Sequence, residues 1–267
     1  MDNLRDGKQV KQAKTRLHHL EPNKVNGYGP RAQICPCGDW HIGASTCDEQ
    51  AIKKQLDLCL KKHIYVIGMG DHLECATRNS VGDGVYKQYG NPDEQMERVI
   101  EFFRPVVKAG LLLGIHRGNH CQRLSKDVGI DVMKWFCKEL SVPYFGHAQN
   151  HIFYLGKQSY TCHSTHGSSG SRLPYMKIRA AMDLMKLTDA EVILYGHTHG
   201  LDHHIPLFEV FNRHLKKSQS YERHVVLTGS FLRYRGSYAE EKNLLPSRIG
   251  SPVISLYASQ HEIRVSI

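Results

Sequence analysis

Five short stretches of this 267-residue chain place an Asp, His or Asn side chain beside a glycine, and each stretch follows a predicted strand. They are GDWH (38–41), GDHLE (70–74), GNH (118–120), HG (166–167) and GHTH (196–199). Glycine permits the sharp turn that ends a strand. Because ligand sites in open α/β sheets form outside the carboxyl ends of strands, we expect these polar side chains to meet at one sheet edge.

The polar side chains of these stretches suit metal binding. Two carboxylates, one amide oxygen and four imidazoles are available: Asp39, Asp71, Asn119, His41, His166, His197 and His199. This set exceeds what a single tetrahedral zinc site uses. Mixed nitrogen and oxygen ligands suit two divalent ions, with Mn²⁺ favoured and Fe, Zn, Ni and Mg as alternatives. Two such ions can activate a water and polarise a phosphoryl oxygen, so the set predicts phosphate-ester hydrolysis.

The order and spacing of the five motifs resemble the calcineurin-like metallophosphoesterase superfamily over residues 32–231. The resemblance implies a four-layer α/β/β/α sandwich of two mixed sheets with a dinuclear site at its edge. It also implies two ligand sets joined by a bridging Asp71: Asp39, His41 and His199 for one metal, and Asn119, His166 and His197 for the other. In the same way, His120 would contact the phosphate and protonate the leaving group. The overall spacing is also similar to that of small phosphoesterases encoded by bacteriophages and prophages.

The third motif departs from the family pattern. Many members continue GNH with an acidic residue, whereas position 121 is Cys here. A general-acid imidazole needs a partner that fixes its tautomer and favours its protonated form. Glu74 lies three residues after Asp71, where serine/threonine protein phosphatases of the superfamily place a supporting Asp. We therefore expect Glu74 to support His120; the alternative is a solvated loop carboxylate.

The fourth motif leaves two histidines as candidates, because His163 and His166 both lie in CHSTHG (162–167). Their separation is odd, so they face opposite sides of an extended strand. His166, which stands next to glycine, fits the motif better. The nearby His72 and His116 are expected to pack in the interior or at the rim of the site.

Two arginines flank the GNH motif. Arg117 and Arg123 are candidates to bind a non-bridging phosphate oxygen through a bidentate contact. The alternative for each is an arginine on the surface with no role in the site.

Composition places the chain among ordinary globular proteins, with 40% hydrophobic and 23% charged residues. No stretch approaches the ~20 apolar residues of a membrane helix, and the first residues lack the apolar core of a secretory signal. We therefore expect a cytoplasmic protein of a bacterial or phage-infected cell with no membrane partner. In such a reducing compartment the 8 cysteines are expected to be reduced, packed thiols. They are scattered, without the two CxxC pairs of a structural zinc site.

The net charge of +9 is unevenly distributed. Residues 1–31 hold seven Lys or Arg against three Asp or Glu, and residues 213–248 hold eight against three. Basic segments that flank a neutral body predict a polyanionic partner, most simply nucleic acid or a nucleotide. Solvated basic arms are the alternative. Within the second segment, FLRYRGSY (231–238) interleaves aromatic residues with arginines, a pattern able to stack bases.

Alternating apolar runs and helical patterns predict the elements that position the motifs. Strands are expected at 34–37, 63–70, 110–115, 190–196 and 224–230, and hairpins at 151–166 and 251–267. Helices are expected at 48–62, 91–108, 128–140 and 174–187. Pro105 is expected to end or kink the second helix. This order predicts mixed sheets in an α/β fold, with a basic peripheral arm over 1–31 and one domain over 32–267.

Three functions compete at this point. The favoured one is a dinuclear-metal phosphodiesterase that acts on nucleic acid. The second is a phosphodiesterase or phosphatase of a small cyclic or linear nucleotide, and the third is an inactive nucleic-acid-binding protein. The absence of DRG after GDHLE argues against a serine/threonine protein phosphatase.

Overall fold

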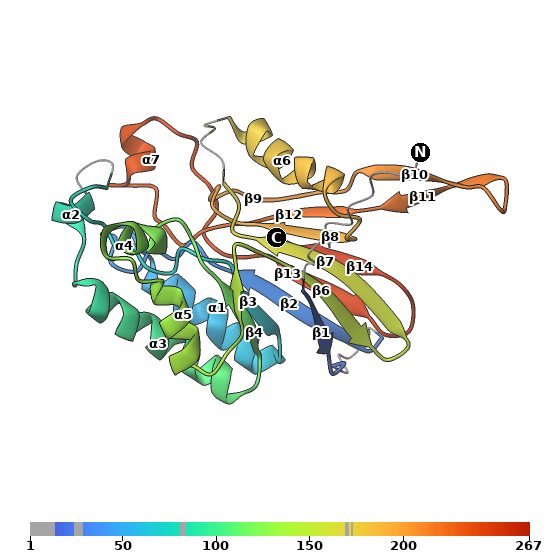
Figure 1. Ribbon diagram of the computed structural model, residues 1–267, viewed down its shortest axis with the longest axis horizontal. Helices are drawn as coiled ribbons and strands as arrows, with labels where there is room; N and C mark the ends of the chain where they lie inside the picture. Colours follow the sequence, from blue (N-terminus) through green and yellow to red (C-terminus); the bar gives the residue numbers. More distant parts are fainter. Residues whose placement is uncertain (1–13, 24–28, 81–83, 169–170, 172) are drawn as a thin grey trace, which may run out of the picture.

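The computed structural model describes residues 14–23, 29–80, 84–168, 171 and 173–267. Two mixed six-stranded sheets pack face to face, and helices cover their outer faces (Figure 1). The predicted four-layer α/β/β/α architecture is confirmed.

The first sheet carries three of the five motifs at its strand ends. Its order is β14-β13-β2-β3-β4-β5, in which β2, β3, β4 and β5 run parallel. The strands are β2 (Arg31–Cys37), β3 (Tyr65–Gly68), β4 (Leu112–His116), β5 (Tyr144–Gly146), β13 (Val253–Tyr257) and β14 (Ile263–Ser266). Because β2, β3 and β4 point the same way, the residues that follow them reach the same edge.

The second sheet supplies the remaining two motifs, in the order β1-β6-β7-β8-β12-β9. Its strands are β1 (Thr15–His19), β6 (Ala148–Leu155), β7 (Gln158–Thr165), β8 (Val192–Tyr195), β9 (Leu201–His204) and β12 (His224–Thr228). β7 and β8 are parallel neighbours, so the motifs that follow them lie side by side. A separate two-stranded sheet joins β10 (Leu207–Asn212) to β11 (Lys217–Glu222).

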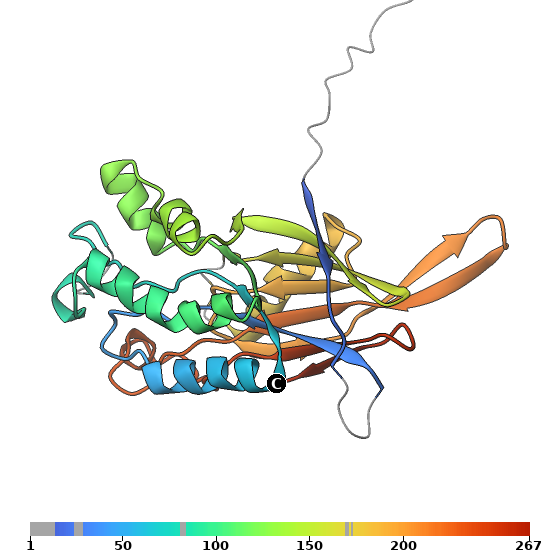
Figure 2. The same ribbon diagram turned by 90° about the horizontal axis from the view of Figure 1, so that it is seen from below.

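Most helices pack outside the first sheet, and one covers the second (Figures 1 and 2). They are α1 (Glu49–Lys62), α2 (Gly84–Lys87), α3 (Pro92–Lys108), α4 (Cys121–Val128), α5 (Val132–Glu139), α6 (Pro174–Asp183), the 3₁₀ turn η1 (Leu184–Lys186) and α7 (Tyr238–Glu241). α3 continues through Pro105 to Lys108 instead of ending there. No helix in the described ranges is both long enough and apolar enough to span a membrane.

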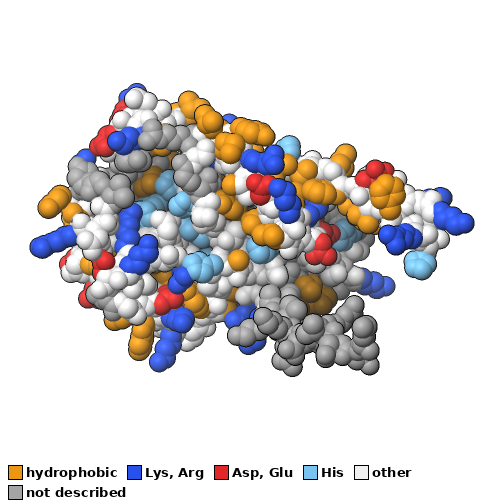
Figure 3. Space-filling view, turned by 45° about the horizontal axis from the view of Figure 1, so that its top comes forward, with side chains coloured by type: hydrophobic (Ala, Val, Ile, Leu, Met, Phe, Trp, Pro, Cys, Tyr) orange, Lys and Arg blue, Asp and Glu red, His pale blue; other side chains and the backbone are white. Residues whose placement is uncertain are grey.

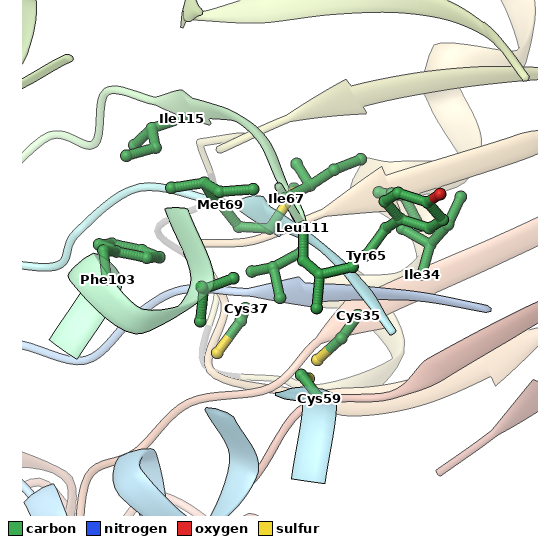
Figure 4. Packing of buried hydrophobic residues seen from close by; sticks show 14 of the residues in the cluster. Ile34, Cys35, Cys37, Cys59, Tyr65, Ile67, Met69, Phe103, Leu111 and Ile115 are labelled. Carbon is green, nitrogen blue, oxygen red and sulfur yellow. The ribbon is translucent and has the colours of Figure 1, made fainter. Parts of the chain in front are cut away.

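The core shows why β8 is apolar throughout. Val192 and Leu194 join the cluster between the two sheets, whereas Ile193 and Tyr195 pack with residues of α6 on the other face. Both faces of the strand are covered, so successive side chains are all buried. In Figure 4, Cys35 and Cys37 lie on the side of β2 that faces α1, where Cys59 is found. All eight cysteines are buried and free, as expected of packed thiols.

Three elements differ from the sequence-based expectations. Thr15–His19, expected in a peripheral arm, forms edge strand β1 and pairs in parallel with β6. α4 begins directly after the GNH turn, where only a turn was expected. Residues 201–222, for which nothing was predicted, form β9, β10 and β11. The basic residues Lys8 and Lys11 of the expected arm lie outside the described residues.

A chain of buried polar side chains connects the two sheets close to the end of β4. The Ser164 hydroxyl lies 2.7 Å from His116 Nε2 and 2.6 Å from His151 Nε2, and His151 Nδ1 lies 3.0 Å from His18 Nε2. Burial lowers the pKa of His116 to about 3, of His151 to about 2 and of His18 to about 4. These imidazoles are therefore neutral at pH 7 and hold β4 to the second sheet through hydrogen bonds.

Acid is expected to destabilise the protein through this chain. The folded-state pKa values lie below the ordinary value of 6.5, so the unfolded chain binds more protons as the pH falls below 6.5, and stability is lost with it. Between pH 7.5 and pH 5.5, each such histidine lowers the free energy of unfolding by about 1.4 kcal/mol. In the His151→Phe variant, we expect the decrease in the free energy of unfolding between these two pH values to be smaller than in wild type by about this amount. The measurement is urea unfolding of the EDTA-treated protein at both pH values. An unchanged pH dependence in this variant would show that His151 is charged in the folded state.

Candidate metal centre

The structure brings every predicted site residue to one edge of the sandwich. The residues follow five strands: Asp39 and His41 follow β2, Asp71 and Glu74 follow β3, Asn119 and His120 follow β4, His166 follows β7, and His197 and His199 follow β8. In the space-filling view, histidine side chains gather on the left half of the molecule (Figure 3). The edge is therefore rich in groups able to bind a cation.

One group of ligand atoms belongs to Asp39, His41 and His199, whose candidate atoms all lie within 4.8 Å of one another. The two imidazole Nε2 atoms are 3.1 Å apart, and His199 Nε2 is 3.4 Å from Asp39 Oδ1. Asp39 is fully buried, and its Oδ1 has no hydrogen-bond partner in the described part of the chain. A buried carboxylate oxygen left without a donor but close to two imidazole nitrogens fits a metal ligand.

A second group consists of Asp71, His166 and His197, again within 4.8 Å. His166 Nδ1 donates to the carbonyl oxygen of Met69 at 2.8 Å. Its Nε2 lies 3.2 Å from Asp71 Oδ2 and 3.1 Å from Asn119 Oδ1. A metal-binding histidine is typically held in this way, with one ring nitrogen donating to a carbonyl and the other facing the ion.

The backbone of these residues is held in an uncommon conformation. Positive φ angles of 46° to 64° occur at five of the candidate ligands: Asp39, His41, Asp71, His197 and His199. For a residue with a side chain, the left-handed region of φ and ψ is higher in energy than the helical or extended regions. Such a residue stays in this conformation only where the surrounding structure requires it. Half of the ten such non-glycine residues in the described chain are candidate ligands, so the strain is concentrated at this edge.

Two glycines allow the strand ends to approach one another. A Cβ at Gly118 would lie 1.9 Å from Asp71 Oδ1, and one at Gly70 would lie 2.7 Å from His166 Nδ1. The free space at Gly118 lets the Asp71 carboxylate accept a hydrogen bond from the backbone N–H of His120 at 2.8 Å. Gly70 and Gly118 are therefore required by the close packing of side chains from neighbouring motifs.

Glu74 contacts two histidines of the cluster. Its Oε2 lies 3.2 Å from His120 Nδ1, the contact expected from the sequence, and 3.0 Å from His41 Nδ1. Burial raises the pKa of Glu74, but its hydrogen bonds to His120 and His41 outweigh burial and hold it well below the usual range. Burial lowers the pKa of His120, but the Asp71 and Glu74 carboxylates raise it above its ordinary value. Before any cation binds, the site thus favours an ionised Glu74 that accepts a hydrogen bond from Nδ1 of the His120 ring.

Arg123 on α4 completes this arrangement. Its guanidinium donates to Glu74 Oε1 and to the Glu74 carbonyl, both at 3.0 Å, and Nη2 lies 3.0 Å from His120 Nε2. The sequence singled out Arg123 only as a possible phosphate ligand, and its place beside His120 follows from the unpredicted helix α4. Arg117 instead lies 3.6 Å from Asp131. The double contact of Glu74 was likewise not predicted.

The other histidines that flank the motifs lie outside the two groups. His163 Nδ1 contacts Asn150 Oδ1 at 2.7 Å, so it is His166 that enters the cluster. His72 is buried, with Nε2 3.3 Å from the Cys37 carbonyl and its ring against Trp40. Phe231, one of the aromatic residues interleaved with arginines, is fully buried in the core and is not available to stack on a base.

Comparisons with known proteins give only distant likenesses. No protein-family model and no curated protein matches the chain. Similar solved structures include a conserved uncharacterized protein, a predicted phosphoesterase, from Streptococcus pneumoniae, with 13% identity, 88% of each chain covered and a TM-score of 0.38. Another is wild-type Vps29 complexed with Zn²⁺ from Entamoeba histolytica, with 14% identity, 88% of this chain and 97% of that chain covered, and a TM-score of 0.36. The site is therefore interpreted from its own geometry.

Proposed function

We propose that this protein is a metal-dependent phosphodiesterase of the calcineurin-like metallophosphoesterase type, and that its substrate is nucleic acid. The observation that carries the proposal is the pair of ligand groups at one sandwich edge, Asp39–His41–His199 and Asp71–His166–His197. A binding protein without activity has no need of two such groups beside a polarised histidine.

The donor set fits two divalent ions. Asp39, His41 and His199 would hold one, Asn119, His166 and His197 the other, and Asp71 both. Imidazole, amide and carboxylate donors favour Mn²⁺, with Fe, Zn, Ni and Mg as alternatives. When bound, such ions supply Lewis-acid stabilisation of phosphate charge and a water of lowered pKa.

The residues around His120 supply the remaining chemistry. Glu74 holds Nδ1 of His120, so Nε2 is the atom able to deliver a proton to a departing oxygen. Glu74 also supports the protonated ring through its negative charge. Arg123 provides a permanent positive charge beside Nε2 and suits an equatorial phosphate oxygen once substrate replaces its resting contact with the imidazole.

The choice of nucleic acid as substrate rests on two features. A general acid is most useful for a poor leaving group, such as the sugar hydroxyl released from a diester. The chain also carries a net charge of +9, and polyphosphates are attracted to such a charge over long distances. A small nucleotide is the competing substrate.

The test is metal-dependent turnover by the EDTA-treated protein. With Mn²⁺ restored, we expect hydrolysis of bis-(p-nitrophenyl) phosphate to exceed that of the monoester, and cleavage of DNA or RNA at low salt. EDTA should abolish both activities. Failure of Mn, Fe, Zn, Ni and Mg alike to support diester hydrolysis would reject an enzyme of this kind. Turnover of small nucleotides without cleavage of nucleic acid would establish the competing substrate.

A further inference from the structure

The β10–β11 hairpin projects from the body as a narrow arm (Figures 1 and 2). Its strands pair with each other in antiparallel register from Leu207↔Glu222 to Asn212↔Lys217 and with no other described strand. Every residue of β11 is exposed. A two-stranded hairpin is marginally stable in water on its own. An arm of this kind is consistent with a partner that packs against it.

The outer half of the arm carries only positive charge. The turn and the start of β11 hold Arg213, Lys216 and Lys217, all exposed and without ion-pair partners among the described residues, together with His214. The two acidic residues of the arm, Glu209 and Glu222, lie nearer its base. Figure 3 shows the positively charged side chains at the far right end of the molecule. The tip is therefore complementary to a polyanion.

Large apolar side chains accompany the cations. Phe211 is 76% exposed and Leu215 is 58% exposed at the tip, and neither belongs to a core cluster. Cations can contact the phosphates, while the exposed apolar groups beside them can contact the apolar edges of bases, such as the thymine methyl group. The arm thus offers two kinds of contact.

The dimensions of the arm favour duplex DNA. A two-stranded β-ribbon fits the major groove of B-form DNA, whereas the major groove of A-form RNA is too narrow to admit side chains. From His199 the chain runs through β9 and β10 to the tip at Asn212, a path of up to about 43 Å at ~3.3 Å per residue. This upper limit corresponds to about 13 base pairs at ~3.4 Å each.

We propose that the β10–β11 hairpin is an arm that binds duplex DNA in its major groove, within about 13 base pairs of the phosphodiester at the metal centre. The inference rests on the proposed function for the identity of that centre. The cations at the tip contact phosphates, while Phe211 and Leu215 contact base edges. The arm accordingly makes the enzyme sensitive to the length and form of its substrate.

The experiment compares two triple variants of the full chain. In one, Arg213, Lys216 and Lys217 are changed to Gln; in the matched control, Lys54, Lys61 and Lys62 of α1, which are also exposed, are changed to Gln. Binding to labelled 30-base-pair DNA, 8-base-pair DNA and 30-base-pair RNA is measured by fluorescence anisotropy without added metal at several salt concentrations. Hydrolysis of bis-(p-nitrophenyl) phosphate is measured with Mn²⁺.

For the arm variant, we expect about tenfold weaker binding to the long DNA and a salt slope reduced by about 2 to 3, because three phosphate contacts are lost. Binding to the short DNA and to the RNA should change little, and the control should bind the long DNA like wild type. Hydrolysis of the small diester should be unchanged, which also shows that the variant is folded.

Equal affinity of the arm variant and the control for long DNA would overturn the proposal. So would arm-dependent binding to anionic phospholipid vesicles in place of DNA, measured by co-sedimentation of the same two variants, which would identify a membrane as the partner. Failure of the proposed function would give a different result. The wild-type protein would then bind DNA more tightly than the arm variant but would hydrolyse no diester with any metal.

Discussion

Asp71→Asn is expected to abolish metal binding and diester hydrolysis together. The Asp71 carboxylate is buried, accepts the His120 backbone N–H at 2.8 Å and lies 3.2 Å from His166 Nε2. Asn preserves the size of the side chain and one acceptor oxygen, so the fold is retained, but it removes the negative charge that would hold two dications. We expect the rate to fall about 10³-fold or more, a loss of several kcal/mol in transition-state stabilisation. Bound metal, measured by elemental analysis, should fall with it.

The control for this variant is Asp57→Asn. Asp57 is an exposed residue of α1 that pairs with Lys53 at 2.7 Å, so the same change of charge there should leave metal content and rate unaltered. Near-normal activity of Asp71→Asn would contradict a dinuclear site bridged by this carboxylate.

His120→Ala is expected to separate catalysis from metal binding. His120 lies against Glu74 and Arg123. It forms a third group of possible ligands with His41 and Glu74, but it is not a member of the two proposed ligand groups. Loss of a general acid lowers the rate by about 10² to 10⁴-fold. Metal content should stay near that of wild type, because Asp39, His41 and Asp71 remain in place. The decrease should be smaller for a diester with a good leaving group, which needs little protonation.

His204→Ala provides the control, since His204 is an exposed histidine of β9 away from the motifs. Rates are compared for bis-(p-nitrophenyl) phosphate and for a diester with an alkyl leaving group. A parallel loss of metal and rate in His120→Ala would make His120 a ligand, and an equal loss on both substrates would exclude a role as the acid.

Much of the site could be predicted from local features of the sequence. A glycine beside Asp, His or Asn after an apolar run marks a strand end, and parallel strands carry such ends to one edge. The hairpin turn at Gly156 and Lys157 could also be predicted from a local pattern, because a glycine separates two alternating stretches. These stretches form β6 and β7, whose pairing ends at Leu155↔Gln158. The glycine beside His166 also favoured it over His163, and the structure places His166 in the cluster.

The tertiary structure alone decided which additional groups meet the predicted ones. Glu74 reaches His41 as well as His120 because the loops after β2 and β3 pair through Ile42 and Leu73. Arg123 reaches His120 because a helix begins at Cys121. Neither contact leaves a local pattern in the sequence.

β1 and the β10–β11 hairpin were missed for a related reason. β1 and β11 are largely polar and exposed, so they show no apolar periodicity. β10 (LFEVFN) is rich in apolar residues, but they do not alternate with polar ones as in a half-buried strand. β1 is a strand because β6 offers it a free edge more than a hundred residues along the chain, where Thr15 pairs with Asn150. Backbone hydrogen bonds of this kind depend on which segments the folded chain brings together. The candidate metal ligands could therefore be predicted from residue type and spacing. The pairing of β1 with β6 depends on the folded second sheet and could not be predicted in this way.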